Sequence, residues 1–253
     1  MGVTRRYVIT GTASGIGQAT KRLLEAKGAR VIGVDIRDAD VIADLTTEAG
    51  RLALVDQVRS LLGNSLDAVI ANAGSGQVSL NFFGAVATLE GLRPLLANGD
   101  GPRATAVTSS AILHPVDESI VESCLAMDER AATEASARSP DLVYASSKRA
   151  LARWIRRSAI LPRWAGGGIP LNGVAPGVTR TPMTEQYIAS ERGRAMLDGW
   201  VPMPLAGYAQ PAQIAPLLDW LTSPENTHIT GQIVFIDGGS DAVLAGDDIW
   251  RSR

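Results

Sequence analysis

The chain has 253 residues, a length at which an α/β fold is often built as one unit. It is 45% hydrophobic and 20% charged with a formal net charge of -2, so it lacks the basic surplus of a nucleic-acid or membrane-surface protein. A single cysteine excludes an intrachain disulfide, and no apolar run reaches the roughly 20 residues of a membrane span. Together these features predict a cytoplasmic protein with neither a nucleic-acid nor a membrane partner.

Strand-like and helix-like segments alternate along the chain. Short β-branched strands are expected at 7–11, 30–35, 41–44 and 66–74, with helices at 16–27, 47–62 and 81–97. Further strands are expected at 103–110, 169–177 and 232–239, and further helices from Leu142 and from Pro211. This alternation predicts a single α/β domain over 1–253, a doubly wound parallel sheet of about seven strands with helices on both faces.

The stretch "TGTASGIG" directly follows the first expected strand and opens the first helix. Gly11, Gly15 and Gly17 allow a sharp turn and a close approach to a pyrophosphate, which the helix N-terminus attracts, while Ser14 adds a hydroxyl donor. Glycines in such a turn can also serve conformation alone. In this strand–turn–helix context we expect dinucleotide binding.

Asp35 ends the second expected strand. A carboxylate there accepts hydrogen bonds from the adenosine ribose and repels a 2′-phosphate, so NAD(H) is favoured over NADP(H). Arg37 leaves the alternative open, because a guanidinium two residues later could reach a phosphate.

In "LVYASSKRALARW", Tyr144 and Lys148 stand at i and i+4, on one helix face. Such a pair is common on helix surfaces and indicates an acid–base centre only in company with other motifs.

Seven motifs provide that company: "TGTASGIG", "NAG" at 72–74, "NFFG" at 81–84, "TSS" at 108–110, "YASSK", "NGVAPGVTRTP" at 172–182 and "GQIVFIDGG". In this order they resemble the short-chain dehydrogenase/reductase family over nearly the whole chain. "VDIRDADVIADL" and "FIDGGSDAV" are most similar to bacterial 3α-hydroxysteroid dehydrogenase/carbonyl reductases. The resemblance implies a Rossmann-like fold and an NAD(H)-dependent oxidoreductase for a hydrophobic secondary alcohol and its ketone.

The resemblance also implies the catalytic roles. Tyr144 is the expected general acid–base, and Lys148 is expected to lower the pKa of Tyr144 and to hold the nicotinamide ribose. Ser110 is expected to bind the substrate oxygen, with Ser109 as the alternative. Asn81 is expected to order a water in a proton relay, or else to bond to nearby backbone.

The implied cofactor contacts follow the carboxyl ends of the strands. Asp44 is expected near the adenine amine, Asn72 to tie strands together, and Thr181 at the carboxamide. The full set is Gly11, Ser14, Gly15, Ile16, Gly17, Asp35, Ile36, Asp44, Leu45, Asn72, Ala73, Gly74, Tyr144, Lys148, Pro176, Gly177, Thr179 and Thr181. His114 and His228 have no ligand-like neighbours in the sequence, so no metal site is expected.

Residues 115–140 depart from the family pattern, in which the serine and the tyrosine stand closer together. This segment looks helical, and through Asp141 it carries seven acidic and two basic residues. The helix after it is basic, with Arg149, Arg153, Arg156 and Arg157. We expect the insertion to cover part of that face and to favour a homodimer over a tetramer; the alternative is that both faces are solvated.

The segment 182–209 corresponds to the family's substrate-binding region. Its many apolar residues suit a bulky hydrophobic substrate, and they suit the packing of a lid onto the core equally well. Two other functions stay open: a dehydrogenase of a smaller alicyclic or aromatic alcohol, and a non-catalytic NAD(H)-binding sensor.

Overall fold

The computed structural model describes residues 4–205 and 207–247. In this part of the chain seven parallel strands form one sheet, in the order β3-β2-β1-β4-β5-β6-β7. They are β1 (Arg6–Thr10), β2 (Arg30–Asp35), β3 (Val41–Ile42), β4 (Ala68–Ala71), β5 (Arg103–Val107), β6 (Leu171–Pro176) and β7 (Ile233–Ile236). The predicted doubly wound sheet of about seven strands is confirmed.

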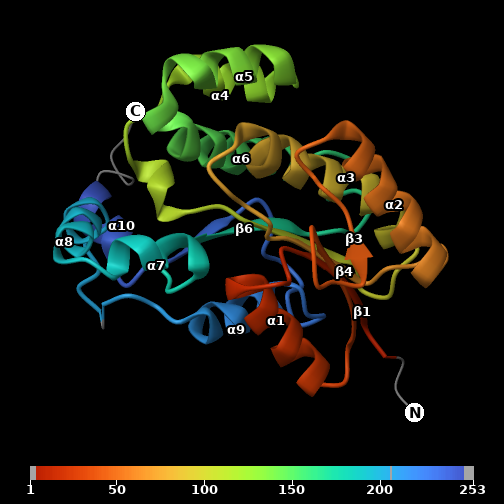
Figure 1. Ribbon diagram of the computed structural model, residues 1–253. Coiled ribbons are helices and arrows are strands. Elements are labelled where there is room, and N and C mark those ends of the chain that lie inside the picture. The colour runs from red at the N-terminus through yellow and green to blue at the C-terminus, as the bar shows by residue number, and fades with distance from the viewer. Residues whose placement is uncertain (1–3, 206, 248–253) are drawn as a thin grey trace.

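Helices cover both faces of the sheet (Figure 1). α1 (Gly15–Ala26) and α9 (Pro211–Leu221) pack together on one face; α2 (Glu48–Leu62), α3 (Ala85–Leu96) and α6 (Val143–Ala159) lie on the other. The remaining helices are α4 (Glu118–Leu125), α5 (Glu129–Arg138), α7 (Pro182–Ile188), α8 (Glu191–Trp200) and α10 (Ser240–Ala245). Among the described residues, no helix is long and apolar enough to cross a membrane.

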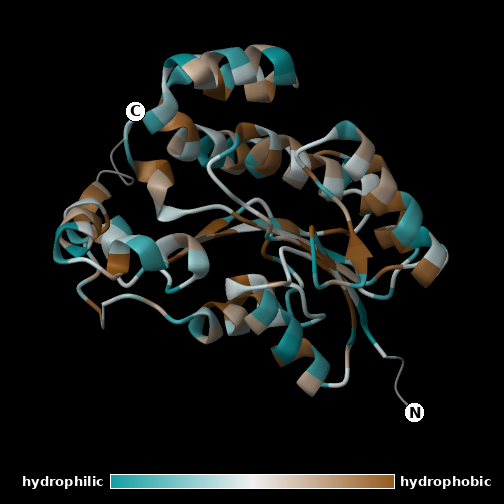
Figure 2. Ribbon diagram, in the orientation of Figure 1, coloured by the Kyte–Doolittle hydropathy of each residue, from teal (hydrophilic) through white to brown (hydrophobic). Residues whose placement is uncertain are grey.

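The strands are apolar on both sides, which is why the sheet needs two helical layers. Val8 and Val69 face the α2–α3–α6 side, whereas Ile9 and Ile70 face the α1–α9 side. Successive strand residues point to opposite faces, so one apolar run contributes side chains to the cores on both sides of the sheet. Figure 2 shows the central strands in brown, the colour of hydrophobic residues.

The order of the strands places the site. The chain runs outward from β1 to β2 and β3 and then returns to β4 on the other side of β1. At such a reversal the loops from the carboxyl ends of β1 and β4 separate and leave a crevice. β4 and β5 end at Ala71 and Val107, so the "NAG" and "TSS" motifs, which the sequence placed inside the expected strands, leave the sheet as loops at this edge.

The insertion forms a helical hairpin, α4 and α5, that packs on α6 (Figure 1). Ile120, Cys124 and Ala132 are fully buried and belong to the same core cluster as α6. Asp117 joins the two ends of the hairpin: it caps α4 at the Ser119 N–H (2.8 Å), and it accepts a hydrogen bond from the Ser139 hydroxyl (2.6 Å). The insertion is therefore an integral part of the core.

The hairpin covers only part of the basic face of α6. Arg153 pairs with Glu122 at 2.8 Å and with Glu118 at 3.4 Å. Arg149 bonds instead to the backbone of residues 112–114, and Arg156 donates to the Gly231 carbonyl at 3.2 Å. The expected contact between the acidic insertion and the basic helix is therefore limited to Arg153 with Glu118 and Glu122.

Candidate active site

The carboxyl ends of the strands open into a cavity of about 570 Å³. Loops after β1 to β6 contribute to its wall, together with the start of α6. All but one of the predicted cofactor residues lie on this wall: Gly11, Ser14, Gly15, Ile16, Asp35, Ile36, Asp44, Leu45, Asn72, Ala73, Gly74, Tyr144, Lys148, Pro176, Gly177, Thr179 and Thr181. The structure thus gathers residues from six distant parts of the sequence.

Gly17 is the exception, because it lies buried in the first turn of α1. A Cβ at this position would lie 2.1 Å from the Gly11 carbonyl oxygen. Gly17 therefore lets the helix pack against the turn without facing the cavity. Gly11 itself adopts a φ of 76°, a left-handed conformation that favours glycine.

Asn72 links the ends of β1 and β4. Its side-chain amide donates to the carbonyls of Thr10 and Gly11 at 3.0 and 3.2 Å. This is the strand-tying arrangement that the sequence suggested for Asn72.

The N-terminal end of α1 is open to an anion. Ser14 is exposed on the cavity wall, and its hydroxyl makes no capping hydrogen bond to the helix. The first turn holds no acidic residue, so no side chain of the helix itself offsets the positive end of the helix dipole. The donors at this end of the cavity suit a phosphate group.

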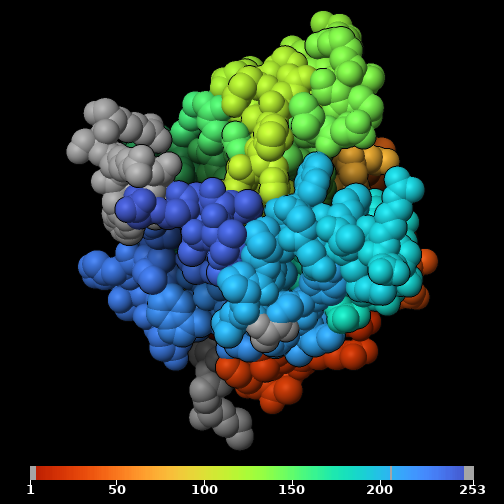
Figure 3. All heavy atoms as spheres, turned by 90° about the vertical axis from the view of Figure 1, so that its left-hand side faces the viewer, coloured from red at the N-terminus to blue at the C-terminus, as the bar shows by residue number. Residues whose placement is uncertain are grey.

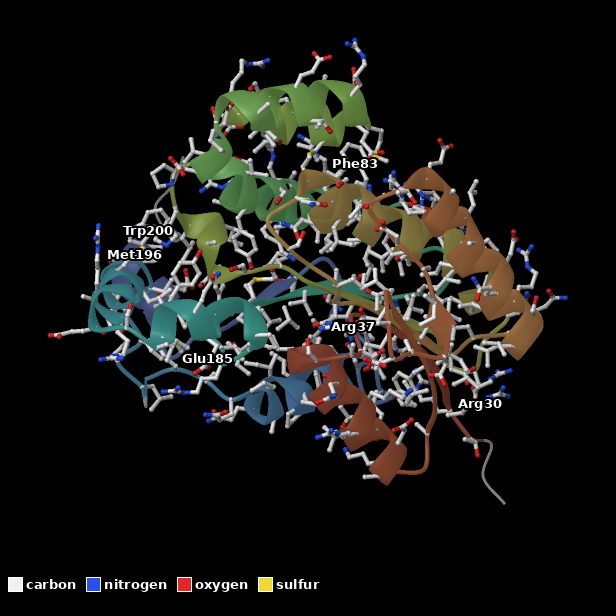
Figure 4. All side chains as sticks on the ribbon, viewed as in Figure 1. Arg30, Arg37, Phe83, Glu185, Met196 and Trp200 are labelled. Atoms are coloured by element: carbon white, nitrogen blue, oxygen red, sulfur yellow. The ribbon has the colours of Figure 1, made fainter. Side chains whose placement is uncertain are left out.

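Asp35 stands beside this anion-binding end. Its carboxylate accepts from the Ala13 N–H at 2.9 Å and from the Ile36 N–H at 2.8 Å, which fixes it on the wall. Further along, Asp44 accepts two hydrogen bonds from Thr46, which lower the pKa of Asp44. Arg37 is exposed on the loop after β2 (Figure 4).

At the other end of the cavity, α6 presents Tyr144 and Lys148. The Lys148 ammonium lies 6.0 Å from the centre of the Tyr144 ring and donates to the Val107 carbonyl at 2.9 Å. Lys148 is 3% exposed, and burial lowers its pKa to about 8. Burial also raises the pKa of the Tyr144 phenol, against an opposing hydrogen bond from Ser109. Burial is the larger of these two effects, so the pKa of Tyr144 is raised and not lowered as the resemblance implied.

The structure places Ser109, rather than Ser110, beside Tyr144. Ser109 lies on the cavity wall and hydrogen-bonds the phenol. Ser110 begins the 3-10 turn η2 (Ser110–Leu113), is 2% exposed and lies outside the described residues that form the wall. Of the two serines, Ser109 has the position expected of the substrate-binding hydroxyl.

Asn81 lies behind the wall, on the π-helix η1 (Ser79–Gly84). Its amide oxygen accepts from the Ser75 N–H at 2.9 Å, and its nitrogen donates to the Ser75 carbonyl at 2.7 Å and to the Ser147 hydroxyl at 3.0 Å. The side chain therefore makes the backbone contacts that were the alternative to a relay. π-Helical turns are frequent at functional sites.

The segment after β6 closes one side of the site. A Cβ at Gly15 would lie 3.1 Å from the Thr181 side chain, so the 179–181 loop touches the glycine turn. α7 and α8 follow, and they cover the face of the molecule in Figure 3 below the insertion. Met183, Met196 and Trp200 are each more than two-fifths exposed, and the latter two lie at the outer edge in Figure 4.

His114 contacts this same segment, with its ring centre 5.2 Å from that of Trp200. Burial and the charge of Arg149 lower the pKa of His114. In the part of the chain that the structure describes, no group of three or more His, Cys, Asp or Glu side chains is placed to hold a metal ion.

Several wall residues were not singled out from the sequence. They are Val34, Ala43, Thr46, Ser75, Gln77, Leu80, Val107 and Thr108, while Pro182, Met183 and Thr184 on the wall belong to the predicted substrate-binding segment 182–209. Most directly flank a predicted residue, so position next to the carboxyl end of a strand is the signal that identifies them.

Nearly the whole chain is similar to proteins named as dehydrogenases and reductases. The family model described as enoyl-(acyl carrier protein) reductase matches residues 11–241. A 3-alpha-hydroxysteroid dehydrogenase/carbonyl reductase of Comamonas testosteroni is 35% identical, over 94% of this chain and 96% of that protein. A cis-4-hydroxycyclohexanecarboxylate dehydrogenase of Sinomonas cyclohexanicum is 29% identical, over 94% and 97%.

A solved structure shares the fold of this chain. The 3-alpha-hydroxysteroid dehydrogenase from Pseudomonas sp. B-0831, complexed with NADH, matches with a TM-score of 0.89 and 38% identity. The match covers 94% of this chain and 98% of that one.

Proposed function

The chain belongs to the short-chain dehydrogenase/reductase family, and we propose that it interconverts a hydrophobic secondary alcohol and its ketone with NAD(H) as the cofactor. As a member it is an NAD(P)-dependent oxidoreductase that acts on CH–OH groups. The observation that carries the proposal is the convergence of Tyr144, Lys148 and Ser109 at one end of the cavity.

The chain's own residues account for the proton and the developing charge. When bound, the nicotinamide supplies or accepts a hydride. In ketone reduction Tyr144 gives its phenolic proton to the carbonyl oxygen, and Ser109 donates a hydrogen bond to the same oxygen. Lys148 places a positive charge 6.0 Å from the Tyr144 ring, which favours the phenolate that remains. In alcohol oxidation the same groups act in reverse.

Four observations support NAD(H) as the cofactor. The open N-terminus of α1 suits the pyrophosphate, and Asp35 beside it suits two ribose hydroxyls while it repels a 2′-phosphate. The cavity volume is in the range of cofactor sites. The relative from Pseudomonas was solved with NADH. We expect the KM for NADH to be lower than the KM for NADPH. The Asp35→Ser variant should bring the two KM values closer together. An unchanged ratio of the two KM values would show that Arg37 or another group sets the cofactor preference.

The name of the Comamonas relative and the exposed apolar side chains of α7 and α8 support a bulky, steroid-like ketone. The name of the Sinomonas relative supports a smaller alicyclic alcohol. A panel of steroid and simple cyclic ketones, followed at the nicotinamide absorbance, separates the two. Turnover of the small ketones alone would exclude the steroid proposal.

The Tyr144→Phe variant tests the chemistry itself. It keeps the ring and removes the hydroxyl, so NADH should still bind while turnover falls by about 100-fold or more. NADH fluorescence and steady-state kinetics measure the two effects. Turnover equal to the wild type would overturn the role of Tyr144 in the mechanism, whereas a wild type without turnover on any alcohol or ketone would favour the NAD(H)-binding sensor.

We also propose that the protein is a homodimer and not a tetramer, because α4 packs on part of the α6 face that would otherwise be free for another copy. A cytoplasmic location stays a prediction from the composition.

A further inference from the structure

Arg149 follows Lys148 directly and binds backbone oxygens on a different part of the chain. Its guanidinium donates to the Ile112 carbonyl through Nε at 2.8 Å and to the His114 carbonyl through Nη2 at 2.7 Å. Arg149 is half-buried, and burial lowers its pKa. Burying a guanidinium costs free energy, which charge-assisted hydrogen bonds to two carbonyls offset. Arg149 thus differs from Arg153, one turn further along, which pairs with surface glutamates.

The carbonyls that Arg149 holds belong to the turn that positions Ser109. Within this turn the Ala111 N–H donates to the Ser109 hydroxyl oxygen at 3.1 Å, and the Ile112 N–H donates to the Ser109 carbonyl at 3.2 Å. Because Ser109 accepts the Ala111 bond, its own proton is free to point into the cavity. A path of hydrogen bonds therefore runs from α6 through the turn to the Ser109 hydroxyl.

The chain itself cannot keep Ser109 and Tyr144 together. They stand 35 positions apart, and between them the chain passes through both helices of the insertion. Contacts across the fold therefore set the distance between the two side chains, among them the hydrogen bond from Lys148 to the Val107 carbonyl and the bonds of Arg149. Arg149 lies on the same helix as Tyr144, five residues later, and so joins the two halves of the site directly.

We propose that Arg149 is a positioning residue, which holds the 109–114 turn against α6 and so sets the place of the Ser109 hydroxyl relative to the Tyr144 phenol. The inference rests on the proposed function, since it matters only if Ser109 and Tyr144 act on one substrate oxygen.

The test compares Arg149→Met with Arg153→Met in the full chain. The first variant keeps the aliphatic length but loses both carbonyl contacts, whereas the second removes an arginine that serves the surface. We expect kcat for ketone reduction to fall by about 10- to 100-fold in Arg149→Met, because small displacements of reacting groups are costly. The affinity for NADH, and the kcat of Arg153→Met, should stay at the wild-type values.

Two further readouts separate positioning from a general loss of structure. The Ser109 hydrogen bond lowers the pKa of Tyr144, so Arg149→Met and Ser109→Ala should both move the alkaline limit of reduction to higher pH. Lys148, the charged group facing the Tyr144 ring, is unchanged in both. The double variant should be no slower than Ser109→Ala alone, because Arg149 acts through Ser109.

Multiplying effects in the double variant, or an equal loss in Arg153→Met, would overturn the proposal. If Arg149→Met melts before it can be assayed, Arg149→Lys, which keeps the charge but not the fork of donors, decides by the same cycle. Wild-type turnover in both Ser109→Ala and Tyr144→Phe is a different result, because it would refute the proposed function and not only the role of Arg149.

Discussion

At the scale of single residues, the site holds its chemistry at a cost in stability. Lys148 is almost fully buried, and its hydrogen bond in the described structure goes to a neutral carbonyl, that of Val107. The pKa of Lys148 is lowered to about 8 because burial disfavours the charged form. A core position filled by an ammonium is typical of a functional requirement, since an apolar side chain would be more stable there.

This cost predicts a dependence of stability on pH. Between pH 8 and 10.5 the unfolded state holds a proton at Lys148 that the folded state has lost, so the free energy of unfolding rises with pH across that window. The Lys148→Met variant lacks the effect. At pH 7 the free energy of unfolding of Lys148→Met should exceed that of the wild type. This difference should shrink as the pH approaches 10.5, by up to on the order of 3 kcal/mol. Urea unfolding at pH 7, 8.5 and 10 measures this; a constant difference would contradict it.

The two neighbouring serines make a second prediction at this scale. Ser109→Ala removes the hydroxyl beside Tyr144 and should lower kcat by about 100-fold or more, as the loss of one oxyanion donor does. Ser110→Ala is the matched control, because Ser110 is buried in the turn. It should leave kcat near the wild-type value. The reverse result, a loss only in Ser110→Ala, would restore Ser110 as the substrate-binding residue.

At the scale of elements, the contact of α1 with the glycine turn shapes the cofactor end of the site. Gly17 lies so close to the Gly11 carbonyl that any side chain must move the helix from the turn. Asn72 then holds the turn to β4 through two carbonyls. The position of the α1 N-terminus therefore depends on the absence of a side chain at Gly17 and on the side-chain amide of Asn72.

We accordingly expect Gly17→Ala to lower the free energy of unfolding by about 1–3 kcal/mol, as overpacking does, and to weaken NADH binding. Gly199→Ala is the control, because a Cβ there meets nothing within 4 Å and α8 gains helix propensity. Thermal melts with and without NADH measure both effects. Equal melting temperatures and equal NADH binding in the two variants would show that the glycine turn tolerates a displacement of α1.

At the scale of the whole molecule, the insertion replaces a free surface on α6 with a packed one. The buried side chains of the insertion belong to the main core. The Asp117 carboxylate links the two ends of the insertion, and the Asp117 N–H donates to the Ser146 hydroxyl of α6 at 2.9 Å. Hydrogen bonds from Ser119 and Ser139 lower the pKa of Asp117 to about 2, so this link persists at all ordinary pH values.

Removing residues 116–139 should expose that face of α6 and allow a larger assembly than the dimer we propose. Light scattering of the shortened and the full chain measures the two masses. Far-UV circular dichroism on the same samples checks that the shortened chain is folded. A folded variant with an unchanged mass would show that the insertion does not control assembly.

Local pattern was enough to predict much of this protein. The alternation of β-branched strands with helices predicted the parallel sheet, because a strand buried on both faces must be apolar throughout. The turn after β1 and the i, i+4 spacing of Tyr144 and Lys148 are local as well, so their geometry follows from a few consecutive residues.

Other features depended on contacts between distant segments. Ser109 and Ser110 are chemically alike and adjacent, and only the extended backbone of Ser109, followed by the turn that begins at Ser110, directs one to the cavity and the other inward. The π-helix around Asn81 has no periodic signature in the sequence. The partners of Arg149 lie 35 and 37 positions away, across the insertion. Hydrogen bonds over such separations are set by how the layers pack, and sequence periodicity carries no record of that packing.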